Sequence, residues 1–260
     1  MPATTLPCVF TDADNTLWDT NAIYAAAQTQ LVQGVSQATE TLPPSTGELA
    51  LVRHFDQQLA KSHPLGFRYP PQLLIDKLCF AISGRDPSSF NKKLIADALD
   101  QYIADLEEPP QLRRGVATGL QILHDVDIPV IIVSEGSRRA IDINIYHHNL
   151  SAHFASIVTC IKSPAIYLTL IEKIGCRSTA FSVGDQLDRD IEFAKKAGMT
   201  TAYFPSDFKP HWHNDSLQTY ADYTINDYTE ILAITDIHYL RCCAPKTPSS
   251  IVKDRTPRAN

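Results

Sequence analysis

The sequence lacks the usual marks of a secreted, membrane-spanning or metal-clustering protein. Its 260 residues include six cysteines, which show no metal-binding spacing. The adjacent pair Cys242 and Cys243 is poorly placed for an ordinary disulfide, so free thiols in a reducing compartment are favoured. No apolar run is long enough to cross a bilayer, and residues 1–4 lack the charged and apolar regions of a signal peptide. We therefore expect a soluble, cytoplasmic protein.

An excess of positive charge is also missing. The sequence has 23 Lys and Arg residues against 29 Asp and Glu residues, which gives a net charge of −6. This balance argues against nucleic acid or an anionic membrane as the main partner. No internal repeat is present, and the length allows one large domain or two unequal ones.

Two carboxylates stand at the end of an apolar run near the N-terminus. The run includes Val9 and Phe10, and it leads to Asp12 and Asp14 at the predicted end of a strand. Two acids this close repel each other unless a cation or a shared proton lies between them. The pair therefore favours a Mg2+-assisted attack by one carboxylate, with the other transferring protons.

Three later segments supply what this pair lacks. A β-branched run ends at Ser134, a shorter run precedes Lys162, and a third leads into Gly184-Asp185 and on to Asp190. Each group follows a predicted parallel strand, at the edge where open α/β sheets bind ligands. A hydroxyl, an ammonium and further carboxylates around an acidic pair form a set suited to phosphoryl transfer.

With these four motifs in this order, the chain resembles the haloacid dehalogenase (HAD) superfamily of hydrolases, in its phosphoglycolate phosphatase-like branch. The resemblance implies that Asp12 is the nucleophile and Asp14 the general acid and base. It implies that Ser134 and Lys162 hold the phosphoryl oxygens. It also implies a Mg2+ site made by the side chains of Asp12 and Asp185 and the backbone carbonyl of Asp14, with Asp190 in support.

Four further residues are expected to bind substrate. Thr16 caps the turn after the nucleophile, beside Asn15, which tolerates left-handed backbone geometry. Glu135 and Gly136 follow Ser134, where an acid would repel a phosphate unless it pointed away. Arg68 lies in a loop of cationic and aromatic residues and could meet a second anion. The sequence His211-Trp212-His213 lacks a third ligand and favours a polar surface loop over a metal site.

The expected fold class is α/β. The resemblance implies a Rossmannoid core with a mainly parallel sheet of five or six strands flanked by helices, plus a small all-helical cap domain. The core would cover 1–18 and 111–238, the cap 19–110, and a flexible tail 241–260. Helices are predicted over 21–35, 45–61, 70–82 and 87–106 from apolar spacing and Pro or Gly punctuation.

The reaction is expected to be Mg2+-dependent hydrolysis of a small phosphorylated metabolite, by a monomer or homodimer. Asp14 argues against carbon–halogen cleavage, because halide leaves without a proton whereas an alkoxide needs one. It also argues against the phosphonate-cleaving branch, which lacks this acid. The alternatives are a phosphomutase of the same superfamily and a non-catalytic phosphate-binding or signalling protein.

Overall fold

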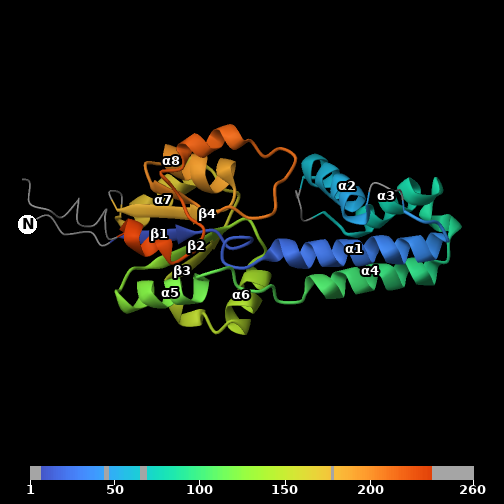
Figure 1. Ribbon diagram of the computed structural model, residues 1–260, viewed down its shortest axis with the longest axis horizontal. Helices are drawn as coiled ribbons and strands as arrows, with labels where there is room; N and C mark the ends of the chain where they lie inside the picture. Colours follow the sequence, from blue (N-terminus) through green and yellow to red (C-terminus); the bar gives the residue numbers. More distant parts are fainter. Residues whose placement is uncertain (1–6, 44–46, 65–68, 177–178, 236–260) are drawn as a thin grey trace, which may run out of the picture.

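A six-stranded parallel sheet forms one part of the molecule, and a bundle of helices forms the other (Figure 1). The computed structural model describes residues 7–43, 47–64, 69–176 and 179–235. The strand order is β3-β2-β1-β4-β5-β6, with every neighbouring pair parallel. The α/β prediction, with a mainly parallel sheet flanked by helices, is confirmed. The strands are β1 (Cys8–Thr11), β2 (Val130–Ser134), β3 (Ser156–Thr159), β4 (Ala180–Gly184), β5 (Thr200–Tyr203) and β6 (Tyr223–Thr224).

Helices cover both faces of this sheet, which explains why its central strands are buried throughout and mostly apolar. Alternate residues of β1 point to opposite faces: Val9 packs with α5 (Val116–Asp125) and α6 (Arg138–His147), and Phe10 packs with α7 (Pro164–Ile174) and α8 (Phe193–Lys196). A helical stretch at 230–235 adds Ile231 and Ile234 to the first face. Every residue of β1, β2 and β4 is buried.

The helical lobe contains α1 (Thr20–Thr39), α2 (Glu48–Ser62), α3 (Gln72–Ser83) and α4 (Lys92–Leu106). All four helices lie at the places that the apolar spacing predicts, with ends shifted by a few residues. They enclose a hydrophobic core of their own, centred on Leu31, Leu74 and Leu78. None of the helices in the described ranges combines the length and apolarity needed to cross a membrane.

Two adjacent chain segments join the lobe to the sheet. The backbone N–H of Asp19 donates to the carbonyl of Gln111 (2.8 Å), and the N–H of Arg113 donates to the carbonyl of Leu17 (2.9 Å). The outgoing and returning segments thus run side by side. The crossing lies at residues 17–19 and 111–113, and the predicted tail at 241–260 lies outside the described residues.

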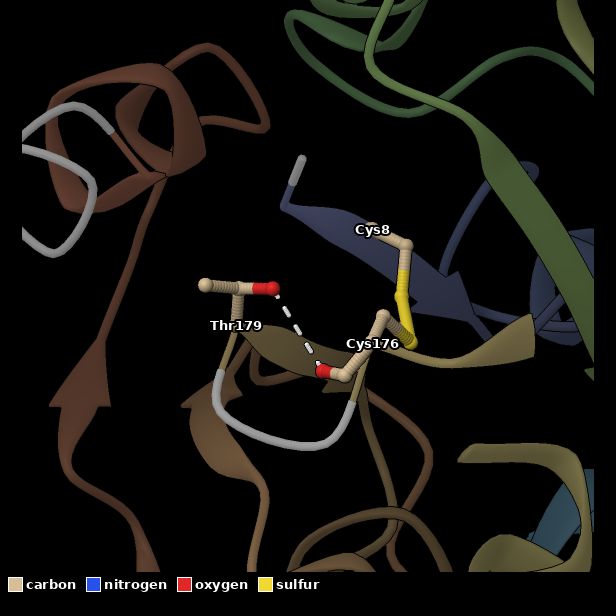
Figure 2. Close-up of a disulfide and its surroundings, with 3 residues drawn as sticks. All are labelled: Cys8, Cys176 and Thr179. Carbon is tan, nitrogen blue, oxygen red and sulfur yellow. Dashed lines mark hydrogen bonds between the residues drawn. A yellow bond between two sulfur atoms is a disulfide. The ribbon is translucent and has the colours of Figure 1, made fainter. Parts of the chain in front are cut away.

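The expectation of free thiols is wrong for two of the cysteines. Cys8 and Cys176 form a disulfide between the start of β1 and the segment that precedes β4 (Figure 2). The two residues are 168 positions apart, so only the pairing of β1 with β4 brings them together. Cys79 and Cys160 are free, and Cys242 and Cys243 lie outside the described residues.

Candidate active site

The predicted motifs meet because their strands are neighbours. In the order β2-β1-β4, the C-terminal ends of three adjacent strands carry Ser134, Asp12 and Asp185 at one edge of the sheet. This edge faces the helical lobe, since the chain passes from the end of β1 directly toward α1 (Figure 1). The edge is therefore the place where the four sequence motifs form one site.

Asp12 is held in place by its backbone and by both carboxylate oxygens. Its N–H donates to the carbonyl of Val183 (2.9 Å) on β4. Oδ1 accepts from Nζ of Lys162 (2.5 Å), and Oδ2 accepts from the hydroxyl of Thr16 (3.2 Å). Asn15 has a φ of 59°, which confirms the expected left-handed turn geometry. The Asp12 carboxylate is therefore fixed between the ammonium of Lys162 and the hydroxyl of Thr16.

Asp14 has one oxygen occupied and the other facing the β2 loop. Oδ1 accepts from Nε1 of Trp18 (3.1 Å) and from the hydroxyl of Thr20 (2.8 Å). Oδ2 lies so close to Gly136 that a Cβ added there would be 2.7 Å from it. Burial, and then the charge of Asp12, raises the pKa of the Asp14 carboxyl. With Oδ1 accepting two hydrogen bonds, a proton on this acid belongs on Oδ2.

Lys162 lies between two acids. Its Nζ contacts Oδ1 of Asp12 and Oδ1 of Asp190, each at 2.5 Å, and its side chain is almost fully buried. Burial alone would lower the pKa of this amine, but the two carboxylates raise it well above the ordinary value. Lys162 therefore carries a fixed positive charge inside the site.

Three carboxylates fit a metal ion. Oxygen atoms of Asp12, Asp185 and Asp190 all lie within 4.8 Å of one another, and all three residues are buried. Asp185 accepts from the hydroxyl of Ser206 (2.7 Å) through Oδ2, whereas its buried Oδ1 has no hydrogen-bond partner. Burial first, and then the neighbouring acids, raises the pKa of Asp185. A buried carboxylate oxygen without a donor is a ligand atom suited to a hard cation such as Mg2+.

Asp190 reaches this cluster from a π-helix, Leu187–Glu192, which the sequence did not indicate. A Cβ added to Gly184 would be 2.3 Å from Cβ of Asp190, so only glycine allows this approach. Oδ2 of Asp190 accepts from the N–H of Gln186 (3.0 Å), and its carbonyl accepts from the hydroxyl of Ser182 (2.9 Å). Single π-turns of this kind occur frequently at functional sites.

The β2 loop provides a buried hydroxyl beside the acids. Ser134 is 1% exposed, and its Oγ accepts from the N–H of Gly136 (2.9 Å). The Cβ position of Gly136 lies 3.1 Å from this Oγ and 2.7 Å from Asp14 Oδ2. The Oγ of Ser134 and the Oδ2 of Asp14 therefore both lie beside the Cα of Gly136, on the side where another residue would carry its Cβ.

Comparison with known proteins agrees with this arrangement. The model of a hydrolase family, the haloacid dehalogenase-like hydrolases, matches residues 6–198. The chain belongs to this family. No curated protein matches the sequence. Among solved structures, the HAD-like hydrolase is similar to a haloacid dehalogenase-like family hydrolase from Xanthomonas campestris, at 17% identity and a TM-score of 0.66, over 91% of this chain and 99% of that one.

Two further structures show the same fold. The HAD-hydrolase YfnB from Bacillus subtilis, bound to magnesium, has 19% identity and a TM-score of 0.63, over 89% of this chain and 99% of that one. A predicted phosphoglycolate phosphatase from Haemophilus somnus 129PT has 15% identity and a TM-score of 0.62, over 90% and 99% respectively. At such identities the likeness establishes the fold of this hydrolase alone.

Most of the predicted site residues of the hydrolase come together. The nucleophile turn, the β2 loop, the Lys162 loop and the π-helix bring nine of them into one cluster: Asp12, Asp14, Thr16, Ser134, Glu135, Gly136, Lys162, Asp185 and Asp190. Arg68 lies outside the described residues. In the loop at 211–213, Nε2 of His213 lies 3.0 Å from Oδ1 of Asp215.

One residue of the hydrolase was missed. The guanidinium of Arg113, on the segment that returns from the helical lobe, donates to the carbonyl of Asn15 (2.5 Å) and to those of Phe204 (3.1 Å) and Pro205 (2.5 Å). It also stacks 3.7 Å from the ring centroid of Phe204. Arg113 thus ties the turn after the nucleophile to the segment that leads to Ser206, the partner of Asp185.

The helical lobe contacts this site through polar side chains. The N–H of Asn21 donates to Oδ1 of Asn15 (2.7 Å), and Arg53 on α2 donates to Oδ1 of Asn21 (2.6 Å). Further along α2, Oε1 of Gln57 accepts from the N–H of His211 (2.7 Å). The nucleophile turn and the 211–213 loop therefore both touch the lobe.

Proposed function

We propose that this HAD-like hydrolase is a Mg2+-dependent phosphatase that cleaves a small phosphomonoester through an aspartyl-phosphate. The observation that carries the proposal is the placement of Asp14. Its Oδ1 is fixed by Trp18 and Thr20, and its Oδ2 faces the β2 loop beside Ser134. An acid with a raised pKa at this place is needed only when the leaving group must receive a proton.

The residues have distinct roles in the proposed reaction. A carboxylate oxygen of Asp12 forms a bond to phosphorus as the bond from phosphorus to the ester oxygen breaks, and Asp14 donates its proton to the departing oxygen. Asp14 then takes a proton from water, whose oxygen attacks phosphorus and releases phosphate and Asp12. The ammonium of Lys162 and the hydroxyl of Ser134 hold phosphoryl oxygens during both steps.

Asp12 and Asp185, with the backbone carbonyl of Asp14, would hold the ion, supported by Asp190. A bound Mg2+ would neutralise negative charge and so allow a carboxylate to approach a phosphate. The Asp185 Oδ1 without a donor supports this assignment.

The test is phosphate release from a broad panel of phosphomonoesters, measured with Mg2+ and with a chelator. Asp12→Asn keeps the shape of the nucleophile and removes its charge, while Asp97→Asn makes the same change at an exposed position of α4. We expect turnover that requires Mg2+, disappears in Asp12→Asn and persists in Asp97→Asn. Turnover retained by Asp12→Asn would refute the mechanism. Isomerised product without free phosphate would indicate a phosphomutase instead.

A further inference from the structure

Glu135 follows Ser134 directly, and both oxygens of its carboxylate are occupied. Oε1 accepts from the backbone N–H of Lys162 (2.8 Å). Oε2 pairs with the guanidinium of Arg189, which lies on the π-helix next to Asp190. One side chain from the β2 loop therefore touches the two other loops that carry the cation and the supporting acid of the site.

These contacts close a ring. From Glu135 the ring passes through the backbone of Lys162 to its ammonium, and from there to Asp190. Asp190 is adjacent to Arg189 in the chain, and Arg189 returns to Glu135. A lysine ammonium sits on a flexible four-carbon stem with several rotamers. Here both the backbone and the terminal nitrogen of Lys162 are held, so the ammonium has a defined position.

The ring also accounts for an acid next to a phosphate-binding hydroxyl. A free carboxylate there would repel an anionic substrate, but Arg189 neutralises Glu135 within a partly buried pair, whose side chains are 34% and 26% exposed. Arg189 lies closer to Glu135 than to its chain neighbour Asp188, whose Oδ2 is 3.7 Å away. Both carboxylate oxygens of Glu135 thus bind groups of the protein, the Lys162 N–H and the Arg189 guanidinium.

We propose that Glu135 is a positioning residue, which acts through Lys162 and with Arg189 as its partner. It holds the loop of Lys162 so that the ammonium stays between Asp12 and Asp190, at the place where the phosphoryl oxygens arrive. We call the two contacts of Glu135, with the Lys162 N–H and with Arg189, the clamp. The consequence of the clamp for catalysis rests on the proposed phosphatase function, whereas the existence of the clamp does not.

The kinetic test compares Glu135→Ala, Glu135→Gln and Arg189→Ala. Loss of a group that orients a metal ligand typically costs about 10- to 100-fold in activity. Because Glu135 orients Lys162 in the same indirect way, we expect Glu135→Ala to lower kcat by a comparable factor. KM should change little, and any change in KM should be the same for substrates with different leaving groups. Glu135→Gln keeps a carbonyl oxygen for the Lys162 N–H and should recover part of kcat. Because the two partners act as one unit, the double variant Glu135→Ala/Arg189→Ala should be no slower than Glu135→Ala alone.

A matched control is the surface ion pair of Arg114 with Asp227, in which the arginine side chain is 81% exposed. Arg114→Ala and Asp227→Ala remove the same kinds of group, and we expect kcat to stay within about twofold of the wild type. Two results would overturn the proposal. One is a KM that changes with the leaving group while kcat is kept, which would make Glu135 a substrate-binding residue. The other is a double variant Glu135→Ala/Arg189→Ala in which the fold-losses in kcat of the two single variants multiply.

A second measurement does not depend on turnover. Hydrogen exchange of the Lys162 amide, followed by NMR, should become faster in Glu135→Ala. It should also become faster in Arg189→Ala, where the acceptor remains but its clamp is lost. Unchanged exchange in Arg189→Ala would overturn the clamp. If the wild type hydrolyses no phosphomonoester, the proposed function fails, and faster exchange in both variants would still support the clamp.

Discussion

Gly136→Ala tests whether Asp14 Oδ2 faces the reacting atoms. The new Cβ would lie 2.7 Å from that oxygen, whereas ordinary contacts begin at 3.4 Å, so the carboxylate or the β2 loop has to move by about 0.7 Å. Gly136 has no positive φ, so alanine introduces no backbone strain there. The effect of the substitution is therefore a displacement within the site.

The expected magnitude follows from this displacement. A shift of about 1 Å in a positioned catalytic group costs up to about 100-fold in rate, so kcat for the best substrate of the panel should fall by about 10- to 100-fold. The overpacking itself should lower the free energy of unfolding by about 1–3 kcal/mol. The assays are steady-state kinetics and chemical denaturation of the same samples.

Gly34→Ala is the matched control, because it creates the same crowding away from the site. Its Cβ would lie 2.9 Å from Cβ of Ala98 at the contact between α1 and α4. It should cost stability, partly offset by about 1 kcal/mol of gained helix propensity, and leave kcat unchanged. Wild-type kcat in Gly136→Ala would refute the argument that Asp14 Oδ2 donates the proton from this position.

Three further changes give separate expectations. Asp185→Asn should weaken Mg2+ binding, measured by calorimetry, and reduce kcat at fixed Mg2+ by more than about 100-fold. Loss of a residue that only orients a metal ligand costs up to about 100-fold, and loss of the ligand itself should cost more. Reduction of the Cys8–Cys176 disulfide should lower the free energy of unfolding by about 2–5 kcal/mol, seen as a lower Tm with reductant, an effect that a Cys176→Ser variant should not show. Burial raises the pKa of Asp56 in the helical lobe, so its ionisation destabilises the fold as pH rises through that folded-state pKa. Asp56→Asn should therefore gain stability relative to the wild type as pH increases above the ordinary carboxyl range. The check is the free energy of unfolding of both proteins from denaturation at several pH values, and a difference between them that does not change with pH would contradict this expectation.

The parts that the sequence predicts are those set by chain direction and periodicity. Parallel strands place their C-terminal ends at one edge, so Asp12, Ser134 and Asp185 could be expected together once the strands were identified. The helices of the lobe follow from apolar residues spaced three and four apart, as at Leu74 and Leu78. These inferences need no knowledge of side-chain contacts.

The parts that the sequence does not predict depend on contacts between distant segments. Arg113 donates to carbonyls of two loops that lie 98 and 91 residues away in the sequence, and a carbonyl acceptor carries no sequence signal. The disulfide depends on the pairing of β1 with β4, since neither cysteine belongs to a recognisable spacing. The π-helix that brings Asp190 to Lys162 depends on the space left by Gly184.

The charge of the site is likewise visible only when its residues are assembled. Asp12, Asp185 and Asp190 bring three carboxylates into one buried cluster, and Lys162 is the cation that pairs with two of them. If all three acids are ionised, two negative charges remain, and uncompensated charge in such an environment is costly. The raised pKa of Asp185 expresses that cost. A divalent cation balances the two charges, whereas a monovalent one leaves an excess, so the charge balance of the cluster favours a divalent ion on grounds separate from the family resemblance.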